Sequence, residues 1–172
     1  MIIYLQMIDT SEDKNKFEQI YLEYQGLMYW VANKILHNTH DAEDAVHQAF
    51  ISIAKNMKKI SEPVCPKTKN YVVTIVENKA IDIYRKKQKH PEMELDEEVK
   101  GITVEYQGTN GLTECLLKLP AEYRNVILLK YYQGYDTREI AHILEISQAN
   151  AGKLLQRAKQ KLEVLCREEG VL

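Results

Sequence analysis

The chain has little of what interrupts helices or builds sheets, since it holds 7 glycines, 4 prolines and almost no segment of alternating β-branched residues. This scarcity favours an all-α fold. Long apolar runs are also missing, because no stretch approaches the roughly 20 residues that a membrane-spanning helix needs. Residues 1–5 lack the basic lead and the small-residue cleavage site of a secretion signal, so we expect neither a signal peptide nor membrane insertion.

Cysteine is scarce too. Cys65, Cys115 and Cys166 lie far apart without a CxxC pair, which predicts reduced thiols in a cytoplasmic protein. His37 and His40 lack the further ligands that a metal site requires. The sequence shows no serine, cysteine or carboxylate constellation typical of catalysis. We therefore expect a protein that is not an enzyme and has no catalytic residue, metal or cofactor.

What the sequence does contain is an uneven distribution of charge. Residues 1–91 carry a net charge of +2, residues 92–112 carry −5, and residues 113–172 carry +1. The middle stretch has three glycines and no helical apolar stripe, so it cannot bury enough apolar surface to offset its chain entropy. We expect two small helical domains, residues 1–91 and 113–172, joined by a flexible acidic linker over residues 92–112.

Four helices are predicted in the N-terminal domain. The first begins at Ser11, the second covers residues 27–36, and the third is capped by Asn38 or Thr39. Three acids stand in the first turn of the third helix, where exposed acids complement the helix dipole. Charge pattern alone favours that explanation over a binding role. The apolar stripe of the third helix comprises Ala42, Ala45, Val46, Ala49, Phe50, Ile53 and Met57.

A basic loop and helix follow. Residues 58–70 contain two prolines and no stripe, which predicts a loop, and a fourth helix runs from about Lys69 to Lys89. Tyr71 and Tyr84 stand among the cations, and lysines bind phosphates while aromatic rings stack on unpaired bases. A solvated basic helix end explains the same pattern, so nucleic-acid contact remains one of two interpretations.

The C-terminal domain carries the most specific pattern. Short helices are expected over residues 112–119 and 121–132. Asp136 and Glu139 have the spacing of a capping box for the next helix, and Ser147 caps a longer helix after a tight turn. This layout predicts a helix-turn-helix that docks on DNA, with an ordinary helical hairpin as the alternative.

In a helix-turn-helix, the N-terminal part of the second helix faces the major groove. Gln and Asn can bond adenine there, and Lys or Arg can bond guanine or phosphate. Arg124 and Arg138 are expected to position phosphates. Glu145 stands at a turn position suited to glycine, which costs on the order of 1 kcal/mol. The outward residues of the second helix are predicted to be Gln148, Ala149, Asn150, Lys153, Gln156 and Arg157.

With these residues in view, the chain resembles a bacterial RNA polymerase sigma factor of the sigma-seventy superfamily, of the extracytoplasmic-function (ECF) type. Residues 41–50 (DAEDAVHQAF) resemble region 2.2, and residues 71–85 resemble the stretch for the −10 promoter element. Residues 119–124, 139–144 and 157–158 resemble region 4. Both regions occur in order and are separated by a linker, which makes the resemblance specific.

The resemblance implies a protein that binds core RNA polymerase and directs promoter-specific transcription initiation. The implied partners are the β′ clamp helices and the β flap of the polymerase, promoter DNA and an anti-sigma factor. The residues implied to bind the polymerase are Asp41, Glu43, Asp44, Gln48 and Phe50. Those implied to hold and melt the −10 element are Lys58, Lys59, Lys67, Lys69, Tyr71, Asn78, Asp82, Arg85 and Lys86. Those implied to bind the −35 element are Arg124, Arg138, Gln148, Asn150, Lys153, Gln156 and Arg157.

Some positions depart from the family pattern. His47-Gln48 stands where the family usually has a Gln-acid pair, and Asn150 and Leu154 differ from the common recognition-helix residues. The alternative function is a free-standing helix-turn-helix regulator that never joins the polymerase. The basic surface predicted over residues 55–90 argues against it, because a ligand-sensing or dimerisation domain needs no such surface.

Overall fold

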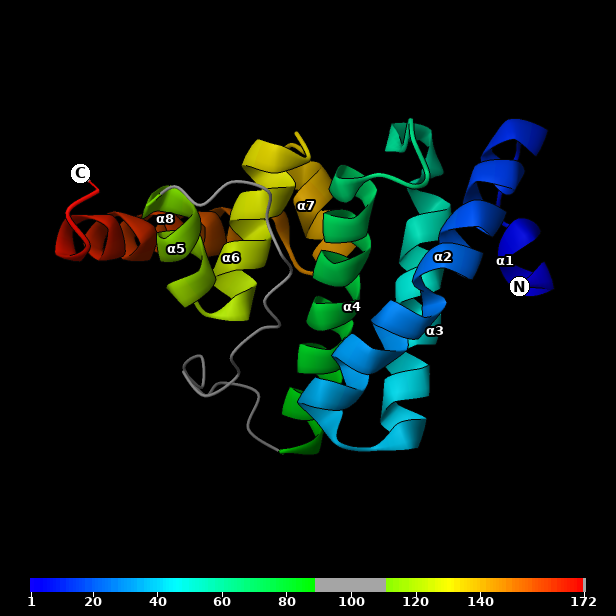
Figure 1. Ribbon diagram of the computed structural model, residues 1–172, viewed down its shortest axis with the longest axis horizontal. Helices are drawn as coiled ribbons and strands as arrows, with labels where there is room; N and C mark the ends of the chain where they lie inside the picture. Colours follow the sequence, from blue (N-terminus) through cyan, green and yellow to red (C-terminus); the bar gives the residue numbers. More distant parts are fainter. Residues whose placement is uncertain (89–110, 172) are drawn as a thin grey trace. The chain divides into compact units, whose positions relative to one another are not determined.

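The computed structural model describes residues 1–88 and 111–171, and every regular element within these ranges is helical. The chain divides into two compact units, Met1–Glu92 and Met93–Leu172 (Figure 1). The predicted all-α fold with two helical regions is therefore confirmed. None of the helices in the described ranges is long and apolar enough to cross a membrane.

The N-terminal unit contains three long helices and two short ones: α1 (Ile2–Leu5), α2 (Ser11–Leu36), α3 (Thr39–Lys55), the 3-10 helix η1 (Met57–Lys59) and α4 (Pro66–Lys87). Helices α2, α3 and α4 each pack against the other two, and α1 packs against α3 (Figure 1). The contact face of α3 includes three fully buried alanines, Ala42, Ala45 and Ala49. Their small side chains let the neighbouring helices approach closely.

The prediction of four helices in this unit is wrong in one respect. The first two predicted helices form the single 26-residue helix α2, which runs through Gly26 without a break. A glycine inside a helix costs about 1 kcal/mol relative to alanine, which weakens a helix without ending it. The buried stripe of Ile20, Tyr24, Met28 and Val31 continues across Gly26 at helical spacing, so packing keeps the helix intact.

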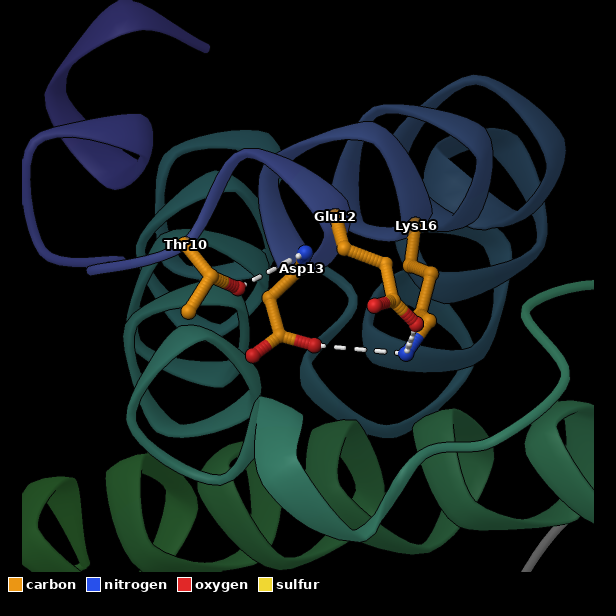
Figure 2. Close-up of polar contacts among 4 residues, drawn as sticks. All are labelled: Thr10, Glu12, Asp13 and Lys16. Carbon is orange, nitrogen blue, oxygen red and sulfur yellow. Dashed lines mark hydrogen bonds and ion pairs between the residues drawn. The ribbon is translucent and has the colours of Figure 1, made fainter.

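The N-cap of helix α2 lies one residue before the predicted cap. Thr10, rather than Ser11, is the N-cap, and its Oγ1 accepts a hydrogen bond of 3.1 Å from the Asp13 backbone N–H (Figure 2). Lys16 Nζ lies 2.8 Å from Glu12 Oε1 and 3.4 Å from Asp13 Oδ1. The hydrogen bond to Glu12 is the main cause that raises the pKa of Lys16. The polar first turn therefore satisfies a backbone donor that the helix itself leaves free.

The fourth helix begins at Pro66 instead of Lys69, so the last part of the predicted loop is helical. Cys65 is the N-cap, and its Sγ accepts a hydrogen bond of 3.4 Å from the Thr68 backbone N–H. Proline suits the first turn because its missing N–H would have no partner there. Thr68 Oγ1 also donates to the Glu62 carbonyl at 2.6 Å, which ties the loop to the start of α4.

The C-terminal unit is built around one long helix. Its elements are α5 (Gly111–Lys118), α6 (Ala121–Ile127), the π-helix η2 (Leu128–Tyr132), α7 (Thr137–Leu144) and α8 (Gln148–Glu168). Helix α8 packs against α5, α6 and α7. The helix predicted over residues 121–132 therefore changes to π geometry in its second half, and Gly134 follows it at a φ of 82°. Glycine adopts this left-handed conformation without steric cost.

Residues 92–110 of the acidic linker predicted over residues 92–112 lie outside the described residues. Its last two positions are described, and both belong to α5, which begins at Gly111. The first helix of the C-terminal unit thus starts earlier than the sequence pattern predicts. Cys115 and Leu119 lie in the core, at the helical spacing that the sequence pattern predicts.

Candidate polymerase and nucleic-acid interfaces

The helix-turn-helix begins at a complete capping box. The Glu139 backbone N–H donates to Asp136 Oδ1 at 2.8 Å, and the Asp136 backbone N–H donates to Glu139 Oε2 at 2.8 Å. This reciprocal pair satisfies two backbone donors at the start of α7. It confirms the capping box predicted from the spacing of the two acids. Ile140 and Ala141 on the next turn are buried, so the cap sets the direction in which α7 enters the core.

The turn between α7 and α8 is tight and polar. Glu145 adopts a left-handed conformation with φ 56° and ψ 37°, as the sequence predicts. The Ile146 backbone N–H donates to the Ala141 carbonyl at 3.0 Å, which closes the end of α7. Ser147 then caps α8, with its Oγ accepting from the Asn150 backbone N–H at 3.2 Å. Together these bonds set the direction in which α8 leaves the turn.

The left-handed Glu145 gives a prediction about stability. We expect Glu145→Gly to raise the free energy of unfolding of the C-terminal unit by about 1 kcal/mol relative to Glu145→Ala, because glycine adopts this φ without a Cβ clash. Alanine keeps the Cβ but removes the carboxylate, so the difference between the two variants isolates the backbone term. Chemical denaturation of both proteins provides the measurement, and equal stabilities would contradict the expectation.

The first turns of α8 present a polar surface. All six outward residues predicted for this helix are exposed: Gln148, Ala149, Asn150, Lys153, Gln156 and Arg157. The opposite face buries Ala151, Leu155 and Ala158 in the unit. The small buried alanines bring α8 close to its neighbours, while amide and cationic side chains remain available to base edges and phosphates.

The two arginines predicted to position phosphates differ in placement. Arg138, on the first turn of α7, is exposed and lies next to the capping box. Arg124, in α6, is buried in this structure, so we do not carry its predicted phosphate contact forward. The packing of α6 in the C-terminal unit accounts for the difference.

The predicted −10 surface follows the loop and α4. Most of its cations are exposed: Lys58, Lys59, Lys67, Lys69 and Lys86. Asp82 and Arg85 are partly exposed, and Asn78 Nδ2 donates to the Thr74 carbonyl of its own helix at 2.8 Å. Tyr71 is buried in this structure, so its ring does not present a face on which a base could stack. The exposed lysines therefore provide the positive charge of this surface, and the buried Tyr71 provides no ring for stacking.

The predicted docking residues on α3 do not share one environment. Glu43, Asp44 and Gln48 are exposed. Asp41 has only 14% of its side chain exposed, and its Oδ2 lies 2.6 Å from Lys87 Nζ at the end of α4. Asp41 therefore joins the N-terminal turn of α3 to the basic C-terminal turn of α4. An acid in the first turn is also favoured by the helix dipole.

Phe50 is buried, which contradicts the exposed docking position predicted for it from the sequence. Its side chain is 1% exposed, and its ring lies 5.9 Å from Phe17, 5.6 Å from Tyr4 and 4.8 Å from Tyr21 between centroids. The residue belongs to an aromatic cluster in the core, so its ring offers no exposed surface to a partner protein in this structure. The apolar spacing of α3 had already placed it on the inner stripe, and that signal outweighs its position within the docking motif.

One contact at the predicted docking face was not predicted from the sequence. Tyr4 in α1 brings its hydroxyl to 2.7 Å from Nδ1 of His47 on α3. The helix that carries Tyr4 was not predicted at all. An apolar pair at i, i+4, Tyr4 and Ile8, was the available signal, and both residues are buried.

Comparison with known proteins decides between the interpretations. Residues 20–90 match the family model for Sigma-70 region 2, and residues 110–162 match that for Sigma-70, region 4. Over 142 residues the chain is 30% identical to the RNA polymerase sigma factor SigV of Bacillus subtilis, covering 80% of this chain and 81% of SigV. The chain is a sigma factor of the sigma-70 family, ECF type.

A further relative agrees with this assignment. The sigma factor shares 29% identity over 175 residues with the ECF RNA polymerase sigma factor SigW of Bacillus subtilis, covering 91% of each chain. Among solved structures it is similar to the sigma factor RpoE of Bartonella quintana, which was crystallised with the anti-sigma factor NepR. That match has 19% identity and a TM-score of 0.42, and it covers 88% of this chain and 96% of RpoE.

The family assignment establishes the general role. A sigma factor binds core RNA polymerase and directs transcription initiation at promoters, so RNA polymerase and promoter DNA are partners of this chain. The presence of a region 2 match upstream of the helix-turn-helix disfavours a free-standing regulator. Because both regions match, we expect initiation to involve the whole chain and not the helix-turn-helix alone.

Proposed function

We propose that the two units of this sigma factor have different binding roles. The exposed face of α3, with Glu43, Asp44 and Gln48, docks on the clamp helices of core RNA polymerase. The polar start of α8 reads the −35 element in the major groove. The observation that carries the second assignment is the capped turn at Glu145 and Ser147, which presents the outward residues of α8 on a rigid support.

The basic surface of the loop and α4 would hold the −10 element as a single strand. Opening duplex DNA costs about 1.4 kcal/mol per stacked step, and capture of the displaced strand by cations offsets that cost. The exposed lysines at positions 58, 59, 67 and 69 bring positive charge to both sides of the α4 N-terminus. Binding free energy alone would offset the cost of opening the duplex, so the protein would act in initiation without being an enzyme.

The remaining assignments rest on the resemblance to the family. We place region 2 within residues 1–91, the linker within residues 92–112, and region 4 from residue 113, with α5 starting slightly earlier. Region 4 would also contact the β flap of the polymerase. We place the protein in the cytoplasm, where RNA polymerase works, and propose an anti-sigma factor as a further partner.

The −35 assignment predicts a result for Arg157. We expect Arg157→Ala to weaken binding of the holoenzyme to a promoter with a −35 element by about tenfold, since one good base or phosphate contact is worth this much. Arg167→Ala is the matched control, because it removes the same side chain from the far end of α8, where Arg167 pairs with Glu163. Competition binding at fixed salt measures both. Equal losses would show that α8 contributes only general charge.

A further inference from the structure

The first eight residues form an apolar element at the end of the N-terminal unit. They contain no charged side chain. Helix α1 leaves Ile2 73% exposed and Ile3 66% exposed, and Met1 and Met7 are exposed as well. Isolated exposed apolar residues are common on protein surfaces, but four within seven residues form a local patch. We call Met1, Ile2, Ile3 and Met7 the α1 patch.

The α1 patch is anchored to the rest of the N-terminal unit by buried side chains. Tyr4 and Ile8, which lie between and after the patch residues, are buried. The Tyr4 ring packs at centroid distances of 5.6 Å from Phe17 and 6.1 Å from Tyr21. Burial, with Tyr21 nearby, raises the pKa of Tyr4, as expected for a ring that is packed into the unit. An anchored segment with outward isoleucines loses little conformational entropy when a partner covers it.

The anchor places the patch beside the proposed docking face. The Tyr4 hydroxyl is 2.7 Å from His47 Nδ1, and the two rings lie 5.4 Å apart between centroids. His47 follows Glu43 and Asp44 by four and three residues on α3, so the three side chains are neighbours on one helix surface. An apolar patch bordered by exposed charges has the composition of a protein interface, which has an apolar centre and a polar rim.

We propose that the α1 patch is part of the surface that binds core RNA polymerase, extending the docking face of α3 by an apolar contact. This inference rests on the proposed function of α3. The occupant follows from continuity, because α1 packs directly on the helix that docks and is joined to it through Tyr4 and His47. The polymerase surface that covers it would be apolar at its centre and basic where it meets Glu43 and Asp44.

The test uses the full-length protein and purified core RNA polymerase. We expect the double variant Ile2→Ser/Ile3→Ser to bind core enzyme about tenfold more weakly, because two exposed isoleucines no longer bury apolar area. Leu22→Ser is the matched control, since Leu22 is 68% exposed on α2 and belongs to no proposed interface. Fluorescence competition gives the affinities, and thermal denaturation confirms that each variant remains folded.

The outcomes separate this inference from the function on which it rests. If Asp44→Arg weakens binding while the isoleucine variant binds like wild type and Leu22→Ser, the α1 inference is overturned and the α3 assignment stands. If neither variant changes binding, both fail. Sedimentation velocity without polymerase tests whether a second copy of this chain binds the α1 patch instead. Self-association that the isoleucine variant abolishes, with unchanged polymerase binding, would also overturn the proposal.

Discussion

Replacement of Phe50 by alanine is expected to lower the free energy of unfolding of the N-terminal unit by about 3–5 kcal/mol. The ring is 1% exposed and contacts Tyr4, Phe17 and Tyr21, so the substitution leaves a cavity among three other aromatic side chains. A loss of this size is a large part of the stability of a small domain. Urea denaturation followed by circular dichroism measures the change.

Gln48→Ala is the control for Phe50→Ala, because Gln48 lies two residues away on α3 and is exposed. Its stability should stay within about 0.5 kcal/mol of wild type. Phe50→Leu should recover much of the lost stability, since leucine refills part of the cavity. If Phe50→Ala were as stable as Gln48→Ala and yet failed to bind polymerase, Phe50 would be a contact residue after all.

Asp44→Arg is expected to weaken binding to core RNA polymerase by about a hundredfold, because reversing one charge at a complementary interface sets like charges against each other. Asp44 is exposed in the first turns of α3, so the substitution should leave the fold intact. Measured association rates should fall more at low salt than at high salt, since exposed charges are screened as ionic strength rises. Surface-immobilised core enzyme allows both measurements.

Glu23→Arg is the matched control for Asp44→Arg. Glu23 is an exposed acid on α2, so the variant changes the net charge of the chain by the same amount at another site. We expect its affinity to stay close to that of wild type. Equal affinities for the two variants would contradict the assignment of the docking face to α3.

Local signals explain why much of the fold was predictable. The capping box at Asp136, the left-handed Glu145 and the cap at Ser147 each depend on residues within a few positions of one another. The stripe of α3 was predictable for the same reason, since burial follows the helical repeat. The helix-turn-helix, and with it the exposed start of α8, therefore follows from the order of residues along the chain.

Contacts between distant residues explain what the sequence analysis missed. Asp41 and Lys87 are 46 residues apart, and nothing in either local pattern indicates that their side chains meet. Helix α1 has only four residues, and it is stabilised by Tyr4 packing on α2 and α3 rather than by its own propensity. The family motif predicts a docking role for Phe50, whereas the position of Phe50 on the inner stripe of α3 predicts burial.

Run-off transcription tests the central claim most directly. The purified chain is mixed with core RNA polymerase and genomic DNA fragments, and transcripts are mapped at their 5′ ends. We expect discrete start sites that require the chain, lie downstream of a shared −35 sequence and weaken with Arg157→Ala but not with Arg167→Ala. Transcription that is unchanged by adding the chain, although the chain binds the same DNA alone, would contradict the account and indicate a regulator that acts apart from the polymerase.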